Sequence, residues 1–221
     1  TSVGDAPGPA RRDRALDQVL RIIEGVGVVD TAETGAGTSL VAALDAVLGH
    51  VLAAADVLVL LVTDQVGGGL LVSLPTIEAA YEKYPELHVI HIDAHTDLRE
   101  DYMGEPLSHA SVIRRCFDFL GDGRIFQFGI RSGLKEEFEW AKEHTYMEKF
   151  TIDTLPQIVQ QLKDVPVYVT IDLDVLDPGT FPGTGTPEPG GITYKELLAG
   201  IAALQDLNQI VAADVVELSP Q

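Results

Sequence analysis

The first 80 residues of the chain contain no lysine, no aromatic residue and no methionine. All six lysines and every aromatic residue lie after Ala80. The composition therefore changes near this position, which a divergent natural sequence and a chain of mosaic origin would both explain. The chain has no long low-complexity tract and 46% of its residues are hydrophobic, so we expect a globular rather than a disordered protein.

Cysteine is almost absent as well. The single residue, Cys116, cannot form an internal disulfide, and the sequence shows no signal-peptide pattern. Together these observations favour a reducing, cytoplasmic setting. We expect Cys116 to be a small buried residue on a helix. The longest apolar run, residues 51–62, is interrupted by Asp56 and is shorter than the roughly 20 residues of a membrane helix, so we expect no membrane partner.

Basic residues are scarce. The chain has 15 lysines and arginines against 34 acidic residues, which gives a formal net charge of -19 at pH 7. Nucleic-acid binding requires clustered lysine and arginine, so we expect no nucleic-acid partner. Cations are the favoured ligands. Outside the motifs described below, most acidic residues are expected to serve solubility only.

Apolar, β-branched segments predict buried strands, and helical periodicity occurs between them. Strands are expected at residues 56–63, 87–93, 124–130, 165–172 and 210–216, and helices at 39–54, 76–84, 109–120, 135–143, 155–162 and 194–204. Strands that are apolar on both faces suit a parallel sheet covered by helices. The expected fold class is therefore α/β, a three-layer α/β/α arrangement with a mostly parallel central sheet, formed by residues 1–221 as a single domain.

The stretch VIHIDAHTDLRED, residues 89–101, places Asp93, His95 and Asp97 directly after a predicted strand. In open α/β sheets, ligands bind beyond the carboxyl ends of the strands. If the chain stays extended there, the two-residue steps send all three side chains toward one point. The alternative is structural, with Asp93 capping the next helix and His95 bonded to the backbone.

A second acidic stretch, TIDLDVLDP, places Asp172, Asp174 and Asp177 at the end of another predicted strand. Asp172 and Asp174 are expected to point the same way, so their carboxylates can meet the first cluster. The repulsion among these carboxylates is relieved either by raised pKa values or by a divalent metal. Oxygen-rich ligation with one histidine favours manganese over zinc, while zinc, cobalt and nickel stay open as alternatives.

Four segments together carry a family resemblance: DAHTD, SHAS at residues 108–111, TIDLDVLDP, and PGTGTPEPGG at residues 182–191. They resemble the signature segments of the ureohydrolase (arginase/agmatinase) family, in particular its agmatinase branch, over residues 67–220. The resemblance implies an arginase-like fold and a cytoplasmic homo-oligomer, a trimer or hexamer, active in polyamine biosynthesis. It also implies two Mn²⁺ ions and a bridging hydroxide that hydrolyses a guanidino compound. Agmatine, a small dication, would give putrescine and urea.

The resemblance also implies a role for each matching residue. The metal ligands would be Asp93, His95, Asp97, Asp172 and Asp174, with Asp93 and Asp172 bridging the two ions and Asp97 also counted as catalytic. His109 would be the histidine that shuttles a proton, because imidazole titrates near neutral pH. Glu217 would hold the substrate guanidinium, and Thr186 would help to position that group. The alternatives are a surface acid at Glu217 and a histidine without special function at His109.

One departure from the family pattern concerns a metal ligand. Family members usually carry a histidine ligand in a glycine-rich segment before the DAHTD strand. Aligned on Pro75, this sequence reads GGGLLVSLP and places Leu70 at that position. Leucine cannot bind metal, so one of the two metal positions should be weakened, since the loss of even a residue that only supports a ligand costs about 10- to 100-fold in affinity or activity. His91, His50 and Asp64 are poor replacements, and for His91 we expect a structural role.

Two further interpretations follow from this departure. The chain is either an active amidinohydrolase, acting on agmatine or on a guanidino acid, or a weak or inactive relative with an incomplete metal site. Compared with the family pattern, the chain is also expected to be shortened at both ends.

Overall fold

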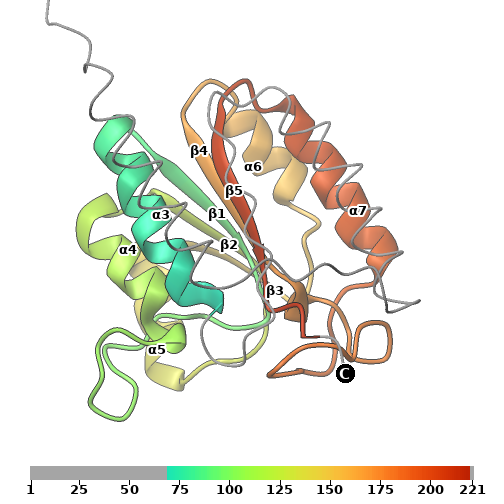
Figure 1. Cartoon of the computed structure of the whole chain (residues 1–221). Coiled ribbons are helices and arrows are strands. Elements are labelled where there is room, and N and C mark those ends of the chain that lie inside the picture. The colour runs from blue at the N-terminus through green and yellow to red at the C-terminus, as the bar shows by residue number, and fades with distance from the viewer. Residues whose placement is uncertain (1–68, 220–221) are drawn as a thin grey trace, which may run out of the picture. The chain divides into compact units, whose positions relative to one another are not determined.

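The computed structural model describes residues 69–219. Element labels follow Figure 1, and the order along the chain is α3 (Gly69–Lys83), β1 (His88–Ile92), η1 (His109–Ser111), α4 (Val112–Leu120), β2 (Ile125–Ile130), α5 (Lys135–His144), β3 (Tyr146–Lys149), α6 (Leu155–Gln161), β4 (Val167–Asp172), η2 (Leu173–Val175), α7 (Tyr194–Ala203), η3 (Leu204–Asp206) and β5 (Ile210–Val216). The helix predicted at residues 39–54 and the strand predicted at 56–63 lie outside the described residues.

The described strands form one parallel sheet in the order β3-β2-β1-β4-β5. The strands predicted around residues 87–93, 124–130, 165–172 and 210–216 are confirmed, with ends shifted by one or two residues at most. Strand β3 was not among the predicted strands. Its residues, YMEK, are all half-buried or exposed and carry two charges, which is characteristic of an edge strand and leaves no apolar run to recognise.

Helices cover both faces of this sheet, so the predicted three-layer α/β/α fold is confirmed (Figure 1). Two separate hydrophobic cores result. One core joins the sheet to α3, α4 and α5 and includes Ile77, Val112 and the fully buried Cys116, as predicted for this thiol. The other joins the opposite face to α6 and α7 through residues such as Leu155 and Ile201. Each helix thus buries one apolar side against the sheet.

The strand order places a topological switch point between β1 and β4. From β1 the chain moves outward to β2 and β3, then returns to add β4 and β5 on the other side of β1. Right-handed crossovers in opposite directions put the connecting helices on opposite faces, and the loops beyond β1 and β4 therefore separate. The crevice between such loops is the usual ligand position in open α/β sheets.

Helix boundaries differ from the prediction at two places. The helix predicted to begin at residue 76 begins at Gly69 and includes Pro75 in its interior. Proline lacks the N–H group that a helix interior uses, so the local sequence favours a helix boundary at this position. The helix predicted at residues 109–120 is divided into the short 3-10 helix η1 and α4, which begins only at Val112.

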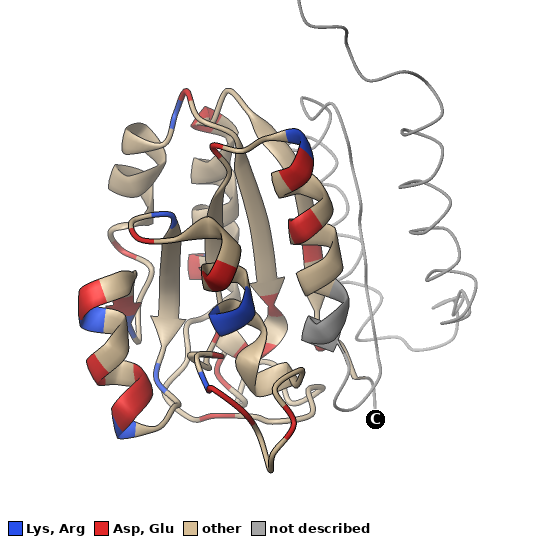
Figure 2. Ribbon diagram, turned by 90° about the vertical axis from the view of Figure 1, so that its left-hand side faces the viewer, with Lys and Arg blue, Asp and Glu red and all other residues tan. Residues whose placement is uncertain are grey.

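Acidic residues occur on the helices and on the loops beyond the strand ends, with few lysines and arginines among them (Figure 2). In the part of the chain that the structure describes, no helix is both long and apolar enough to cross a membrane.

The loop that follows β1 is tied to α5 by a buried carboxylate. Glu137 is 5% exposed, and its Oε1 accepts hydrogen bonds from Thr96 Oγ1 at 2.6 Å and from the Leu98 amide at 3.1 Å. Its Oε2 accepts from the Leu134 amide at 2.6 Å, which caps the start of α5. One side chain therefore anchors both a helix end and the loop that contains His95 and Asp97.

We predict that Glu137→Ala lowers the free energy of unfolding by about 2–4 kcal/mol, because buried donors left without an acceptor cost about 1–3 kcal/mol each. Chemical denaturation measures this change. Glu136→Ala, at an exposed position in the same turn, is the matched control and should stay within about 0.5 kcal/mol of the parent. Equal losses in the two variants would contradict the anchoring role.

Candidate metal centre

The two acidic stretches meet at the switch point. Asp93 follows the last residue of β1, and Asp172 is the last residue of β4, the strand that pairs with β1. Both carboxyl groups are buried. The predicted meeting of the DAHTD and DLD segments at one sheet edge is therefore seen in the structure.

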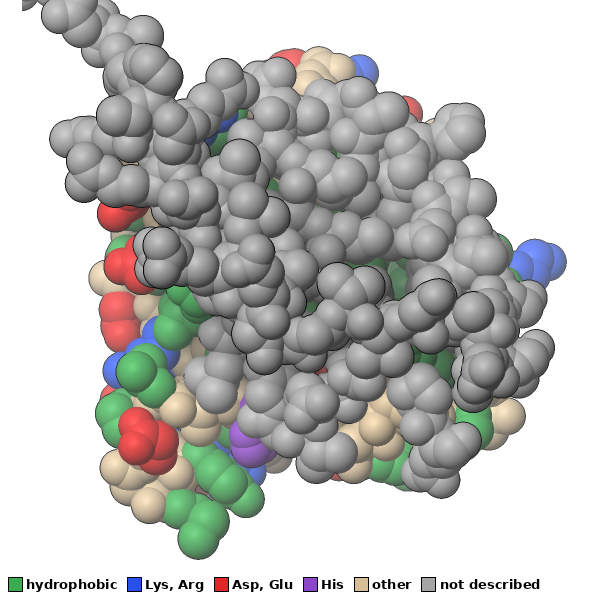
Figure 3. All heavy atoms as spheres, viewed as in Figure 1, with side chains coloured by type: hydrophobic (Ala, Val, Ile, Leu, Met, Phe, Trp, Pro, Cys, Tyr) green, Lys and Arg blue, Asp and Glu red, His purple; other side chains and the backbone are tan. Residues whose placement is uncertain are grey.

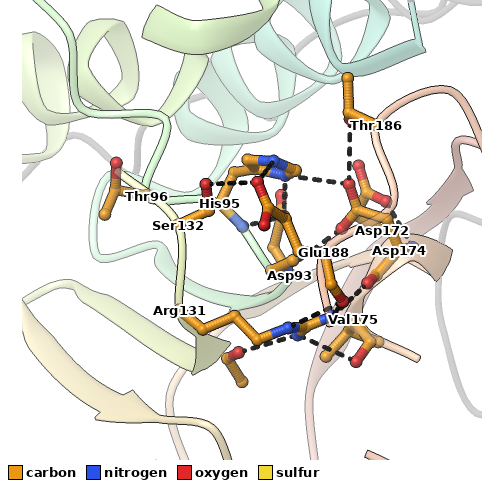
Figure 4. A network of polar contacts seen from close by, with 12 residues as sticks. Asp93, His95, Thr96, Arg131, Ser132, Asp172, Asp174, Val175, Thr186 and Glu188 are labelled. Atoms are coloured by element: carbon orange, nitrogen blue, oxygen red, sulfur yellow. Dashed lines mark hydrogen bonds and ion pairs between the residues drawn. The ribbon is translucent and has the colours of Figure 1, made fainter. Parts of the chain in front are cut away.

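His95 links the two stretches directly (Figure 4). Its Nδ1 lies 2.9 Å from Asp174 Oδ2 and 3.5 Å from Asp93 Oδ1. The backbone adds two more contacts, since the His95 amide donates to Asp93 Oδ1 at 2.6 Å and the Ala94 amide donates to Asp174 Oδ1 at 3.1 Å. The loop after β1 thus holds one carboxylate from each of the two stretches.

Asp172 and Asp174 come together in a different way from the predicted strand alternation. The strand ends at Asp172, and Asp174 lies in the 3-10 turn η2. Asp172 caps this turn by accepting a hydrogen bond from the Asp174 amide at 2.8 Å. The turn redirects the chain, so both side chains remain at the buried edge. Asp177 lies apart from them and accepts hydrogen bonds from the amides of Gly179, Gly190 and Gly191.

Asp97 also departs from the extended chain that the sequence suggested. Its φ is 53°, in the left-handed region that a residue other than glycine or asparagine rarely adopts. Surrounding contacts hold this conformation, including the hydrogen bond from the Arg114 amide to the Asp97 carbonyl at 3.0 Å. Backbone strain of this kind is frequent at functional sites. Asp97 Oδ2 is buried and has no hydrogen-bond partner among the described residues.

Electrostatics at this edge reflect crowding of like charges. Burial, followed by the charges of neighbouring carboxylates, raises the pKa of Asp97, Asp172 and Asp174. Burial would lower the pKa of His95, but its contacts with Asp174 and Asp93 outweigh this effect and raise it to about 11. Without a further cation, the protonated His95 therefore offsets part of the repulsion, and the remaining repulsion makes the carboxyl groups harder to ionise.

The donor atoms suit a divalent cation. Asp93, His95 and Asp174 offer ligand atoms that all lie within 4.8 Å of one another, and so do His91, Asp93 and Asp97. The unpartnered Oδ2 of Asp97 is an independent sign, because a buried carboxylate oxygen normally has a partner. Asp172 is in neither group, yet it is close enough to Asp93 and Asp174 for their charges to raise its pKa. The mainly carboxylate donor set fits a hard or borderline metal ion.

The remaining predicted residues surround this cluster. Thr186 Oγ1 donates to Asp174 Oδ2 at 3.4 Å (Figure 4). Glu217 directly follows β5 with a φ of 60°, and its charge contributes to the raised pKa of Asp172. His109 begins η1, and burial, the charge of Arg99 and the charge of His95 lower its pKa. The predicted residues beyond the metal ligands thus lie on separate segments near the same edge.

His109 borders a loop with exposed apolar side chains. Its ring packs edge-on against Tyr102 at a centroid distance of 5.3 Å. Tyr102, Met103 and Leu107 in this loop are exposed, and Met103 is 90% accessible. Figure 3 shows hydrophobic side chains gathered at the lower left, where the green loop of Figure 1 lies.

Sequence reasoning did not identify two residues that support the site. Arg131, just after β2, donates hydrogen bonds to the carbonyls of Asp174 at 2.7 Å, Val175 at 3.1 Å and Glu188 at 2.9 Å (Figure 4). The Glu188 side chain accepts from Ser132 Oγ at 2.8 Å and lies 3.7 Å from His95 Nε2. Glu188 belongs to the PGTGTPEPGG segment and could have been suspected, whereas an isolated arginine after a strand carries no recognisable signal.

Close packing also shapes the turn that carries Asp174. Gly129 in β2 has a φ of 84°, and a Cβ atom there would lie 2.4 Å from Val175 Cγ2 in η2. Only glycine combines this backbone conformation with this close approach. Leu70, the position of the expected missing ligand, is the second residue of α3, and its side chain lies outside what the structure describes.

Comparison with known proteins agrees with this architecture. The chain is 55% identical to the agmatinase of Bacillus anthracis over 157 residues, which cover 70% of this chain and 54% of that protein. It is 31% identical to the guanidinobutyrase of Pseudomonas aeruginosa over 166 residues, covering 70% of this chain and 52% of that protein. A crystal structure of a proposed agmatinase from Clostridium difficile superimposes with a TM-score of 0.70 at 38% identity, covering 99% of this chain and 84% of that chain.

The chain spans about half the length of the curated relatives that it matches. The sequence profile of the arginase family nevertheless matches residues 13–221. With the parallel sheet and the carboxylate cluster at its switch point, this match shows that the chain belongs to the arginase family.

Proposed function

We propose that this chain is the catalytic part of a manganese-dependent amidinohydrolase that converts a guanidino compound, agmatine in particular, into urea and an amine. The observation that carries this proposal is the buried cluster at the switch point, where Asp97 Oδ2 has no partner among the described residues. The similarity to the agmatinase of Bacillus anthracis supports the same reaction class. For agmatine the amine is putrescine, which would place the enzyme in polyamine biosynthesis.

The five acidic and imidazole groups would hold two Mn²⁺ ions, and these residues are Asp93, His95, Asp97, Asp172 and Asp174. Asp93 directly follows β1 and Asp172 ends the adjacent strand β4, which would place both carboxylates where the ions are held. When bound, manganese lowers the pKa of coordinated water and so supplies a nucleophile at neutral pH. Asp97 would contribute its unpartnered oxygen to this ligand set, and its catalytic role stays a prediction.

The surrounding residues would bind the substrate and move the proton. Glu217 would pair with the guanidinium group, and Thr186 would help to position it. The lowered pKa of His109 keeps its ring neutral near pH 7, so it can accept a proton and deliver it to the leaving amine. By resemblance the enzyme acts in the cytoplasm as a homo-oligomer, a trimer or hexamer, and its organisation as one domain over residues 1–221 stays a prediction.

Two alternatives have support of their own. A guanidino acid is a second candidate substrate, because the chain is also similar to a guanidinobutyrase. The formal net charge of -19 favours the dication agmatine over an acid that carries a carboxylate. A weak or inactive relative is the other alternative, and Leu70 at the expected position of a histidine ligand supports it.

Urea release from agmatine tests the proposal directly. Folded protein preincubated with excess Mn²⁺ should release urea from agmatine faster than from 4-guanidinobutyrate at equal concentration. Faster release from the acid would assign the guanidino acid as the substrate. No urea from either compound, with folding confirmed by circular dichroism, would favour the inactive relative.

Leu70→His should increase both Mn²⁺ binding and urea release, because it restores an imidazole where the family carries a metal ligand. We expect a gain of about 10-fold or more in Mn²⁺ affinity, comparable to the effect of a lost supporting group. Calorimetric titration and the urea assay measure the two effects. Leu71→His is the matched control, since it adds the same imidazole at the neighbouring position of α3. Equal gains in both variants, or none in Leu70→His, would contradict the assignment of this position.

Mn²⁺ binding should release protons. His95, whose pKa is about 11, is protonated in the metal-free protein from pH 6 to pH 8, and it must lose that proton to bind an ion. Mn²⁺ affinity should therefore rise with pH across this interval, by about tenfold per pH unit for each proton released. Titrations in buffers of different ionisation enthalpy count the protons. Binding without proton release would show that His95 is not a ligand.

A further inference from the structure

A row of polar side chains crosses the sheet directly beneath the proposed metal ligands. Gln127 in β2 pairs in register with His91 in β1, His91 pairs with Thr170 in β4, and Thr170 pairs with Asp214 in β5. All four side chains are completely buried. His91 precedes Asp93 by two residues and Thr170 precedes Asp172 by two, so the row lies on the same sheet face as these carboxylates. Buried polar groups need hydrogen-bond partners. The partners of His91 and Gln127 include Asp93 itself and the backbone of the loop that contains His95 and Asp97.

The amide of Gln127 has a defined orientation. Its Nε2 donates to the Thr96 carbonyl at 2.8 Å, and its Oε1 accepts from Thr145 Oγ1 at 3.2 Å. The reversed orientation would place two oxygens against each other at the Thr96 contact. Gln127 Nε2 also lies 3.2 Å from His91 Nδ1. An amide nitrogen can only donate, so His91 Nδ1 accepts this hydrogen bond.

This contact and the Asp93 carboxylate on the other ring nitrogen both require the same tautomer of His91. With Nδ1 as acceptor, the hydrogen of the neutral ring is on Nε2, which lies 2.8 Å from Asp93 Oδ2 and donates to it. The other oxygen, Oδ1, accepts from the His95 amide and faces the His95 ring. One oxygen of Asp93 is therefore held from within the core, while the other is directed toward the cluster.

We propose that Gln127 and His91 form a positioning relay that orients the carboxylate of Asp93 for metal binding. The inference rests on the proposed metal centre. Gln127 holds the ring of His91 through Nδ1, and His91 holds Asp93 through Nε2. The same amide holds the ligand loop at Thr96, between His95 and Asp97. A single glutamine thus couples the orientation of Asp93 to the path of the loop that carries two further ligands.

The relay also explains why His91 is a positioning residue, although its ligand atom lies within 4.8 Å of those of Asp93 and Asp97. In this tautomer Nε2 carries a hydrogen and has no free lone pair for an ion. Moving the hydrogen to Nδ1 would bring it against the amide hydrogens of Gln127. His91 therefore supports a ligand in the way that hydrogen-bonded groups behind metal ligands generally do.

Replacement of His91 tests the first step of the relay. His91→Phe preserves a ring but removes the donor to Asp93, and we expect Mn²⁺ affinity measured by calorimetry to fall by about 10- to 100-fold. His91→Gln returns an N–H near the position of Nε2 and should recover most of the loss. His88→Phe is the control, because His88 lies on the same strand and bonds to the Glu86 carbonyl. Parent-like affinity in His91→Phe, no recovery in His91→Gln, or an equal loss in His88→Phe would overturn the proposal.

A second measurement requires no metal. In the metal-free protein, ¹⁵N chemical shifts of His91, assigned by their absence in His91→Phe, should show a protonated Nε2 and an unprotonated Nδ1. Gln127→Met removes the hydrogen bond to Nδ1 and should shift the Nδ1 resonance, while the Asp93 carboxylate keeps the hydrogen on Nε2. A hydrogen on Nδ1 in the parent, or an unchanged Nδ1 resonance in Gln127→Met, would overturn the relay. If the parent shows the expected tautomer but binds no Mn²⁺, the metal centre fails and the positioning role fails with it, while the hydrogen-bond assignment stands.

Discussion

Repulsion among buried carboxylates is the constraint on which the rest of this structure depends. Asp93, Asp97, Asp172 and Asp174 are each at most 5% exposed and share one end of the sheet. Two unit charges 4 Å apart interact by about 4 kcal/mol at an effective dielectric constant of 20, so several unpaired carboxylates would be costly. Backbone amides and His95 offset part of this repulsion, and the pKa values of Asp97, Asp172 and Asp174 are raised. A divalent cation would offset the remaining repulsion.

The parallel sheet makes this crowding possible because it is rigid and its strands end together. The side chains that hold the surrounding loops come from outside the cluster. Arg131 binds the carbonyls of the turn after β4, Glu137 anchors the loop after β1, and Gln127 reaches the same loop from the core. Each of these residues satisfies groups on two segments at once. The proposed ligands are therefore held in place by bonds that do not involve a metal, which reduces the reorganisation that binding requires.

The proposed metal ligands and the residues proposed to contact the substrate lie in different parts of the fold. The proposed ligands lie at the ends of β1 and β4 or in the residues just beyond them, whereas His109 and Thr186 lie in longer connecting segments. This chain is similar both to a protein named agmatinase and to one named guanidinobutyrase. Similar sequences in this family therefore carry names that refer to different guanidino substrates. Selection of the substrate is therefore expected to depend on loops, which vary more readily than the sheet.

Much of the fold and of the site could be predicted from the sequence. Long apolar segments identified four of the five described strands, because burial on both faces leaves a clear pattern, and β3 escaped because an edge strand does not. Short acidic motifs after those strands identified Asp93, His95, Asp172 and Asp174, since parallel strands end at a common edge. Leu70 remains a prediction of the sequence alone, because its side chain is not described.

The amino-acid sequence by itself determined which chemical groups are available and that strand ends would bring them to one side. Only the tertiary structure decided how they face one another. The left-handed backbone at Asp97, the turn at Asp174 and the position of the His91 ring depend on contacts with Arg114, Arg131 and Gln127, which are distant in the sequence. Hydrogen bonds have strict geometry but no sequence periodicity, so such contacts leave no local pattern from which they could have been predicted.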